Sequence, residues 1–446
     1  MKIALIADVH ANVFALQAVV SDARARGAAE FWDLGDATGY NPFPNETIAL
    51  LRRLKAKSVL GNYDKKVLHF AKEKVHWKKD KDADKYFSFE WTSQNLCWWH
   101  KRYLRSLPLK RTLRQPPFSF LLVHGSPAAI DEGLGQDTPY ARLEELASLV
   151  RVDVVLGAHA HSPMDKKASG VRFVNPGSVG RPFDKDPRAS YALLDITGGL
   201  LRVEHHRVDY SLEKNLARMK KLGFPSSLID SIRLGQSLDT LKDEQRQREE
   251  EKILSEALAL AETCRYDKAH AKQVGRLALM LFDQLKDFHR FDARERFLLQ
   301  CAAILHDIGW VNGGGRHHKT SRDLIMRSPE LSLTEDERTI VALLARYHRR
   351  SLPAVGHKLY GFLSGEDKDR VNQLSAILRI ADGLDATHRA LVKEIRCLVS
   401  EQQLKVDVVC PEPIDEEIES VREKADFFKE FFGKDVAISR VSGDAV

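Results

Sequence analysis

The 446-residue sequence contains few cysteines, no long apolar run and only a small excess of positive charge. Its five cysteines are far apart and form no Cys-x-x-Cys pair, which excludes a disulfide framework and a thiolate zinc cluster. No apolar run reaches the ~18 residues of a membrane-spanning helix, and no signal peptide precedes the first strand-like segment. We therefore expect a cytoplasmic protein with no membrane partner.

The charge balance limits the partners further. The 69 Lys and Arg residues against 63 Asp and Glu residues leave a formal net charge of +6. Spread over this length, the excess suits a small anionic substrate but lacks the concentrated basic track of a nucleic-acid-binding protein. We expect no stable complex with nucleic acid, and the sequence leaves the oligomeric state open.

Two regions with different patterns make up the chain. Up to about residue 210, short runs of Val, Leu and Ile alternate with helical stretches, which is typical of a layered α/β domain. Later apolar residues recur with helical spacing, and the tail contains two strand-like runs, an acidic helix and a last short run. We predict four parts: an α/β domain at 1–238, a charged helical connector at 239–252, an all-α domain at 253–391 and a small ββαβ appendage at 392–446.

Metal-binding residue types follow nearly every predicted strand of the first domain. Strands end at Asp-Val-His, Gly-Asp, Gly-Asn, His-Gly and Gly-Ala-His-Ala-His, which supply the candidates Asp8, His10, Asp36, Asn62, His124, His159 and His161. Because ligands bind beyond the carboxyl ends of strands in open α/β sheets, we expect these side chains to converge. Seven nitrogen and oxygen donors indicate two divalent ions that share a carboxylate, an arrangement suited to phosphoryl chemistry. Manganese is the favoured metal, with iron, zinc or nickel as alternatives.

In order and spacing, these five motifs resemble those of the calcineurin-like metallophosphoesterases. Residues 175–182 and 190–195 resemble the closing signature of the small bacterial phosphodiesterase branch of that family. The resemblance implies an α/β four-layer sandwich. It also implies two ligand sets around a bridging Asp36: Asp8, His10 and His161 for one metal, and Asn62, His124 and His159 for the other.

The resemblance also assigns catalytic roles. Asn62 and His124 would stabilise the charge that develops on the phosphate. Many relatives carry a His directly after the motif Asn to protonate the leaving oxygen, whereas this chain has Tyr63. A neutral phenol is a poor acid at neutral pH, which favours phosphodiesters with good leaving groups, strained cyclic diesters or metal-assisted departure over unactivated alkyl monoesters.

A second set of candidates lies in the helical region. His270, the adjacent pair His306 and Asp307, and Asp382 fall on or beside apolar helix faces, where such groups are costly unless they are paired or bind metal. Their order resembles that of HD-domain metal phosphohydrolases, and residues 302–309, 317–321, 345–351 and 380–385 resemble the C-terminal HD domain of the exopolyphosphatase/guanosine pentaphosphatase family. The resemblance implies one or two divalent metals. Candidates for a second metal or for phosphate contact are His317, His318, His348, Arg349 and Arg350.

The actin-like catalytic half of that second family is missing, so its exopolyphosphatase activity cannot be carried over. We predict a tandem phosphoesterase whose first site hydrolyses a phosphodiester of the nucleotide or 2′,3′-cyclic phosphate type, with a second HD phosphohydrolase site. The first alternative is a phosphodiesterase regulated by an HD domain that senses a nucleotide without turnover. The second alternative is a nuclease that acts on polymeric nucleic acid.

Overall fold

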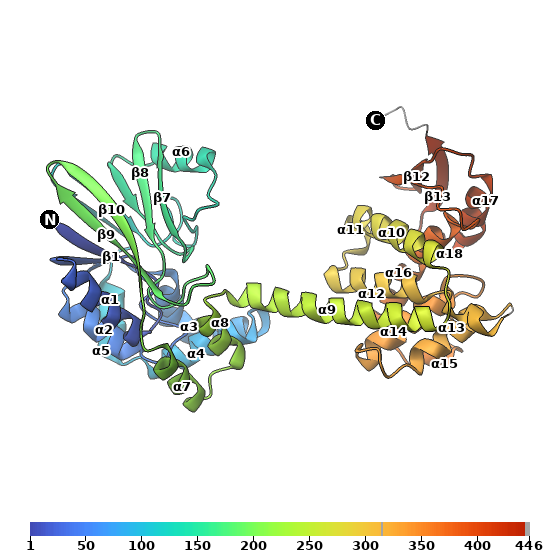
Figure 1. Cartoon of the computed structure of the whole chain (residues 1–446), viewed down its shortest axis with the longest axis horizontal. Helices are drawn as coiled ribbons and strands as arrows, with labels where there is room; N and C mark the ends of the chain where they lie inside the picture. Colours follow the sequence, from blue (N-terminus) through green and yellow to red (C-terminus); the bar gives the residue numbers. More distant parts are fainter. Residues whose placement is uncertain (314, 442–446) are drawn as a thin grey trace. The chain divides into compact units, whose positions relative to one another are not determined.

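The computed structural model describes residues 1–313 and 315–441, and the last five residues of the predicted appendage lie outside this range. The chain divides into two compact units, Met1–Glu244 and Gln245–Val446 (Figure 1). Among the described residues, no helix combines the length and the apolar character needed to cross a membrane.

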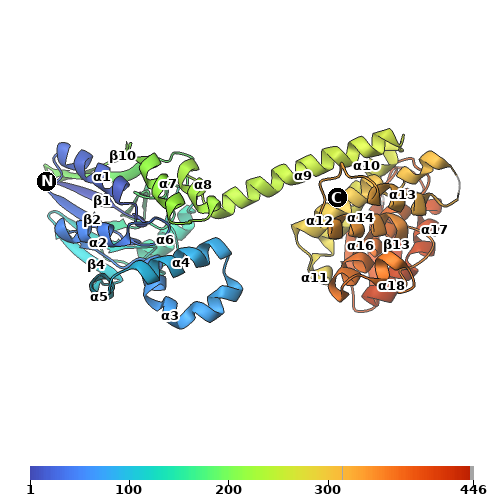
Figure 2. The same cartoon turned by 90° about the horizontal axis from the view of Figure 1, so that it is seen from below.

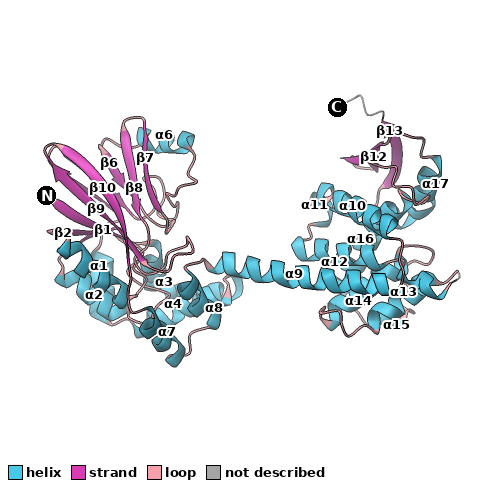
Figure 3. Ribbon diagram, in the orientation of Figure 1, coloured by secondary structure: helices cyan, strands magenta, loops and turns pink. Residues whose placement is uncertain are grey.

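Two five-stranded sheets form the first unit (Figure 3). The first sheet has the order β10 (Leu200–Val208), β9 (Ala189–Thr197), β1 (Lys2–Ile6), β2 (Glu30–Asp33) and β3 (Lys57–Ser58). The second sheet has the order β4 (Lys110–Gln115), β5 (Phe118–Val123), β6 (Val154–Leu156), β8 (Val171–Pro176) and β7 (Pro163–Ala168). Strands β1, β2 and β3 are parallel, as are β5, β6 and β8, so the carboxyl ends within each set meet at one edge.

Alternating apolar side chains pack the first unit into four layers. In β1, Ile3 and Leu5 face the second sheet, whereas Ala4 and Ile6 face the helices on the other side. Helix α1 (Val13–Ala25) covers the first sheet and α6 (Tyr140–Ser148) covers the second. The predicted α/β four-layer sandwich is confirmed.

Further helices surround the sandwich. They are α2 (Pro44–Arg53), α3 (Asn62–Asp80), α4 (Ala83–Asn95), α5 (Trp98–Ser106), α7 (Leu212–Lys221) and α8 (Ser226–Leu234). The structure adds the strands β4, β7 and β10, which the sequence pattern does not reveal because each is rich in charged residues and lies at the edge of a sheet. The predicted connector is part of one continuous helix, α9 (Leu238–Thr263), whose last turns pack in the core of the second unit through residues such as Ile253 and Ala257.

The second unit is a helical bundle (Figure 2). Its helices are α10 (Lys268–Gln284), α11 (Lys286–His289), α12 (Ala293–Leu305), the 3-10 helix η1 (Ile308–Asn312), α13 (His317–Met326), α14 (Glu335–Tyr347), α15 (Lys358–Gly361) and α16 (Gly365–Gly383). Side chains spaced by three or four residues, such as Val274, Leu277 and Leu281 of α10, form its core.

A three-stranded sheet completes the second unit. Its order is β11 (Glu394–Val399), β12 (Gln403–Val409) and β13 (Asp435–Val441). The acidic helix predicted between β12 and β13 is two helices, α17 (Asp415–Lys424) and α18 (Asp426–Phe432), because the chain turns at Ala425 and buries both Phe427 and Phe428. The small sheet at the end of the chain is confirmed, with the element order ββααβ.

Candidate metal centres

The strand ends of the first unit bring the seven predicted side chains together. Asp8 and His10 follow β1, Asp36 follows β2, Asn62 opens α3 just after β3, His124 follows β5, and His159 and His161 follow β6. Two clusters of potential ligands result, one made by Asp8, His10 and His161 and the other by Asp36, His124 and His159. The resemblance to the calcineurin-like family implies the same two groups, with Asn62 added to the second.

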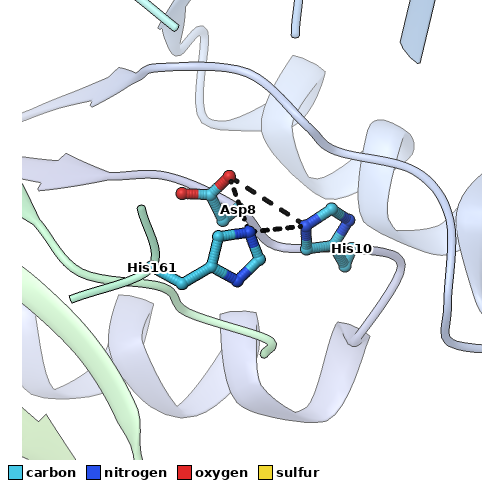
Figure 4. Close-up of side chains that lie close together, drawn as sticks. All are labelled: Asp8, His10 and His161. Carbon is cyan, nitrogen blue, oxygen red and sulfur yellow. Dashed lines mark hydrogen bonds and ion pairs between the residues drawn. The ribbon is translucent and has the colours of Figure 1, made fainter. Parts of the chain in front are cut away.

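Figure 4 shows the first of these clusters. His10 Nε2 lies 3.3 Å from His161 Nε2, and Asp8 Oδ1 lies 4.0 Å and 3.5 Å from these two nitrogens. Carbonyl oxygens accept hydrogen bonds from both Nδ1 atoms, Thr38 from His10 at 3.0 Å and Arg181 from His161 at 2.5 Å. Since Nδ1 carries the proton, both Nε2 lone pairs face the carboxylate.

The second cluster is built in the same way. His124 Nδ1 donates to the Leu34 carbonyl oxygen at 2.9 Å, and its Nε2 lies 3.4 Å from Asp36 Oδ2 and 3.1 Å from Asn62 Oδ1. His159 Nδ1 lies 3.3 Å from His124 Nε2. Four donor atoms therefore converge on one point.

Asp36 lies between the two clusters. Its Oδ2 is 3.4 Å from His124 Nε2 and 3.9 Å from His10 Nε2, while its Oδ1 accepts a 2.7 Å hydrogen bond from the backbone N–H of Tyr63. This is the position that a bridging carboxylate needs.

The donor set fits two divalent cations. Asp8 Oδ1 and Asp36 Oδ2 are buried and have no hydrogen-bond partner among the described residues. Buried carboxylate oxygens without a donor, next to imidazole lone pairs, are unfavourable unless a cation neutralises them. The orphaned oxygens are therefore the observation that supports a metal pair here.

The backbone around these ligands is strained. Asp8, His10, Asp36, His159 and His161 all have positive φ angles, at 51°, 46°, 55°, 67° and 59°. Non-glycine residues rarely adopt this region, and such outliers gather at functional sites. The strain directs consecutive polar side chains into one centre.

Burial and mutual charge set the protonation of the metal-free cluster. Burial raises the pKa of Asp8 to about 8. Burial opposes ionisation of Asp36, but the charge of His124 outweighs it and lowers the pKa of Asp36 to about 2. For His124, the Asp36 charge overcomes the burial effect and raises the pKa to about 9, whereas burial lowers the pKa of His10 to about 4. Asp8 and His124 therefore hold protons that cations would displace.

Tyr63 does not face the cluster as an acid. Its hydroxyl hydrogen-bonds with the hydroxyl of Tyr40, and burial raises its pKa well above the ordinary value. Because such a phenol releases no proton at neutral pH, the contribution of Tyr63 is the backbone N–H that holds Asp36.

Two basic residues near the clusters were not predicted from the sequence as site residues. A cavity of about 370 Å³ above the clusters is lined by Arg181 and Lys66 as well as by Asp36 and Asn62. The side chain of Arg181 is only 4% exposed, and its guanidinium carbon lies 3.6 Å from the centre of the Tyr40 ring. Among the described residues, no carboxylate pairs with this guanidinium and no acceptor binds its Nε. Its position directly after the Gly-Ser-Val-Gly signature was the available signal, and Lys66 lies one helical turn after Asn62 on α3.

The helical unit brings its four predicted ligands together too. His270 Nε2 lies 3.3 Å from Asp382 Oδ1 and 3.3 Å from His306 Nε2. Asp307 Oδ2 lies 4.0 Å from His270 Nε2 and 3.8 Å from His306 Nε2. The ends of α10, α12 and α16 thus meet at one buried point.

A neighbouring cluster shares Asp307. Its Oδ1 lies 3.2 Å from His317 Nε2 and 3.3 Å from His348 Nε2, and Arg349 donates to His317 Nε2 at 3.3 Å. His318 and Arg350 are outside the two described clusters around Asp307. His318 follows His317 on α13, and a helix turns by about 100° per residue, so its side chain points elsewhere.

Three residues around this centre were missed. Asp385 Oδ2 accepts a 2.9 Å hydrogen bond from His270 Nδ1. The ring of His388 stacks on the ring of His270 with the two ring centres 3.7 Å apart. The Lys424 ammonium lies 2.6 Å from Asp382 Oδ2. Burial opposes protonation of His270, but Asp382 and Asp385 outweigh it and raise its pKa to about 10. Asp385 had a signal in the Asp-Gly-Leu-Asp stretch, whereas only the tertiary fold brings Lys424 of α17 to this point.

The fold and the paired clusters define the first unit as a metal-dependent phosphoesterase domain. Residues 1–199 match the calcineurin-like phosphoesterase superfamily domain, and residues 253–419 match domain III of the Ppx/GppA phosphatases. An uncharacterized protein of Methanocaldococcus jannaschii is 30% identical over 250 residues, which are 52% of this chain and 98% of that protein. The chain belongs to the calcineurin-like phosphoesterase superfamily.

Solved structures with a similar first unit include a metallophosphoesterase and a hypothetical protein. A metallophosphoesterase from Sphaerobacter thermophilus is 31% identical with a TM-score of 0.44, and the match covers 53% of this chain and 99% of that chain. A hypothetical protein from Pyrococcus horikoshii OT3 is 24% identical with a TM-score of 0.49, and the match covers the same shares, 53% and 99%.

Proposed function

We propose that the first unit hydrolyses a phosphodiester of the nucleotide or 2′,3′-cyclic phosphate type with two divalent metal ions, manganese before iron, zinc or nickel. The observation that carries the proposal is the pair of ligand clusters with Asp36 between them, next to a cavity whose Arg181 and Lys66 have no carboxylate partner among the described residues. A cavity of about 370 Å³ suits a small phosphorylated substrate or an RNA end better than a polymer track. We place this activity in the cytoplasm.

The ligands would divide between two cations. One would take Asp8, His10 and His161, the other Asn62, His124 and His159, and Asp36 would bridge them. When bound, such a pair supplies an activated water and stabilises charge on the phosphate oxygens. Carbonyl oxygens hold the Nδ1 protons of His10, His124 and His161, so the three Nε2 atoms stay oriented without rearrangement.

Residues of the cavity wall would bind the substrate. The Arg181 guanidinium, stacked on Tyr40 and next to the Phe183 ring at 4.7 Å, is held in one orientation and offers its N–H groups to an anionic oxygen. Lys66 lies 5.2 Å from the centre of the Tyr63 ring, and burial lowers its pKa. Both cations lack a carboxylate partner among the described residues, so a phosphate group is the partner that the cavity provides for.

The protonation of Tyr63 limits which leaving groups the site can release. Its hydroxyl is bound to Tyr40 and its pKa is raised, so it supplies no proton. The substrate is therefore a diester or cyclic diester whose leaving oxygen departs without a strong protein acid.

For the second unit we propose an HD-type phosphohydrolase site that holds one or two divalent metals. Two ligand clusters share Asp307, as the clusters of the first unit share Asp36. Arg349 at His317 would contact a substrate phosphate.

A substrate panel tests both sites. The wild-type chain, Asp36→Ala and Asp307→Ala are each assayed for hydrolysis of several substrates: bis-p-nitrophenyl phosphate, cyclic and linear nucleotides, and guanosine tetraphosphate. We expect Asp36→Ala to abolish diesterase activity and Asp307→Ala to abolish a different reaction of the panel. Diesterase activity that survives Asp36→Ala would refute the first assignment, and an Asp307→Ala variant that loses no reaction would refute the second.

A further inference from the structure

A cavity of about 520 Å³ in the second unit lies apart from the metal clusters. It is formed by the end of α13, the end of α14 and the segment that leads into α15. Among the described residues that line it, none belongs to a metal cluster. The cavity is therefore a separate site from the His and Asp centre.

The cavity carries an unpaired buried cation. Arg346 is 8% exposed and lines the cavity, and its Nε has no hydrogen-bond partner in the described part of the chain. No carboxylate of the described residues forms an ion pair with it. A buried guanidinium without an anion is unfavourable, so an anionic ligand would stabilise this position.

The other lining groups add to the positive charge. Arg322 and Lys358 join Arg346, against the single carboxylate of Asp323, which is paired with Arg322 at 2.5 Å. Three cations against one carboxylate leave an excess of two positive charges. His357 adds no charge, because burial and the charge of Arg346 lower its pKa. Its Nδ1 lies 2.8 Å from the Tyr347 hydroxyl.

The rest of the wall is apolar. Met326, Leu343 and Leu359 line the cavity beside the basic groups. A wall with apolar side chains and a few placed polar groups is typical of sites for small organic ligands, and inorganic phosphate would leave most of this volume unused. We propose that the cavity binds an organic phosphate of mononucleotide size, with the phosphate on Arg346 and the organic part on the apolar wall.

The same helices hold the cavity and the metal clusters. Arg346 and His348 are two residues apart at the end of α14, which turns their side chains to nearly opposite sides. In α13, His317 belongs to the metal cluster around Asp307, whereas Arg322 lines the cavity. The organic phosphate thus binds on the far side of the helices that carry the metal ligands, without using a metal.

Calorimetry on the full chain tests this site. The ligands titrated are adenosine monophosphate, guanosine monophosphate and inorganic phosphate. They are added to the wild type, to Arg346→Gln and Lys358→Gln, and to the control Arg327→Gln. The control removes an exposed charge at the end of α13 that lies outside the cavity. We expect one of the nucleotides to bind at least ~10-fold more tightly than phosphate, and Arg346→Gln to weaken this binding ~10-fold. Lys358→Gln should weaken it ~3-fold, and Arg327→Gln should leave it unchanged.

Two further measurements separate this site from the metal centre. Nucleotide binding should persist in the presence of a metal chelator and in Asp307→Ala. Lys358 is exposed, so its substitution reports on binding even if Arg346→Gln fails to fold. The proposal is overturned if neither nucleotide binds, if the Lys358 and Arg327 variants bind equally well, or if chelation or Asp307→Ala removes the binding.

Discussion

The two sets of candidate metal ligands in this chain are held by different kinds of backbone. In the first unit the candidate ligands other than Asn62 lie in loops after strands, and five of them have positive φ angles. In the second unit the ligands lie in helices or at helix ends, and His306 and Asp307 have ordinary negative φ angles of −60° and −109°. The sheet edge turns its side chains inward through loops with positive φ angles, whereas the helix ends place His306 and Asp307 at ordinary angles; only the neighbouring His388, among the described residues of the potential ligand groups there, has a positive φ, at 57°.

The surroundings of the two centres also differ. Arg181 and Lys66 beside the first centre have no carboxylate partner among the described residues, whereas the Lys424 ammonium lies 2.6 Å from Asp382 Oδ2 at the second. The first centre thus keeps cations ready for an anionic substrate, and the second is partly neutralised by its own chain.

The largest contrast is expected from matched glycine substitutions. A Cβ at Gly61 would overlap Asp36 Oδ1 and the Asp36 backbone N, and a Cβ at Gly309 would overlap the backbone of His317 and Ser321. We expect Gly61→Ala to lower kcat/KM for bis-p-nitrophenyl phosphate ~1000-fold because the bridging carboxylate moves. Gly309→Ala should leave that value unchanged and reduce the metal content of the second centre. Equal losses of diesterase activity in the two variants would contradict the separation of the centres.

Metal uptake should depend on pH more steeply at the first centre. Below pH 8, Asp8 and His124 are both protonated without metal, since their pKa values are raised to about 8 and about 9. Metal binding displaces both protons, so affinity should rise with pH by up to ~100-fold per unit until these groups have ionised. At the second centre the pKa of His270 is raised to about 10, and the loss of its single extra proton gives ~10-fold per unit.

Calorimetry of manganese binding in buffers of different ionisation enthalpy counts these protons. Asp307→Ala isolates the first centre and Asp36→Ala isolates the second. A metal affinity of the first centre that stays constant between pH 6 and 8 would contradict the protonation that burial and charge predict.

A smaller effect is expected at the substrate-binding wall. Arg181→Gln removes the stacked guanidinium and should raise KM for a diester ~10-fold with little change in kcat, because the metal ligands stay in place. Arg105→Gln, which removes an exposed charge outside the cavity, is the control. A loss confined to kcat would show that Arg181 acts on the chemical step instead.

The smallest change should come from Lys424. Lys424→Gln removes the ammonium that lies 2.6 Å from Asp382 Oδ2. Because this ammonium repels a metal cation, the second centre should bind manganese ~3-fold more tightly, with diesterase activity unchanged. Weaker metal binding by the variant would show that Lys424 orients Asp382 rather than competing with the metal.

Much of the first centre was predictable from local sequence. Apolar runs of four to six residues that stop at Asp or His define both a strand and its carboxyl end, so the positions of Asp8, Asp36 and His124 follow from the pattern. No local pattern marks Arg181, since its position depends on contact with the ring of Tyr40, which is far from it in the sequence, as well as with the ring of Phe183. The charged edge strands β4, β7 and β10 were missed for a similar reason, because only pairing with a neighbour makes them strands.

The sequence by itself determined the periodicities, and with them the layered first domain, the helical second domain and the residues that end each strand, because these depend on neighbours within a few positions. The tertiary structure alone decided which oxygens remain without a donor, which lone pairs face each other and which cations lack a partner. Such properties arise from groups far apart in the sequence, such as His10 and His161 at a separation of 151 residues, and burial by the whole fold gives them their energetic weight.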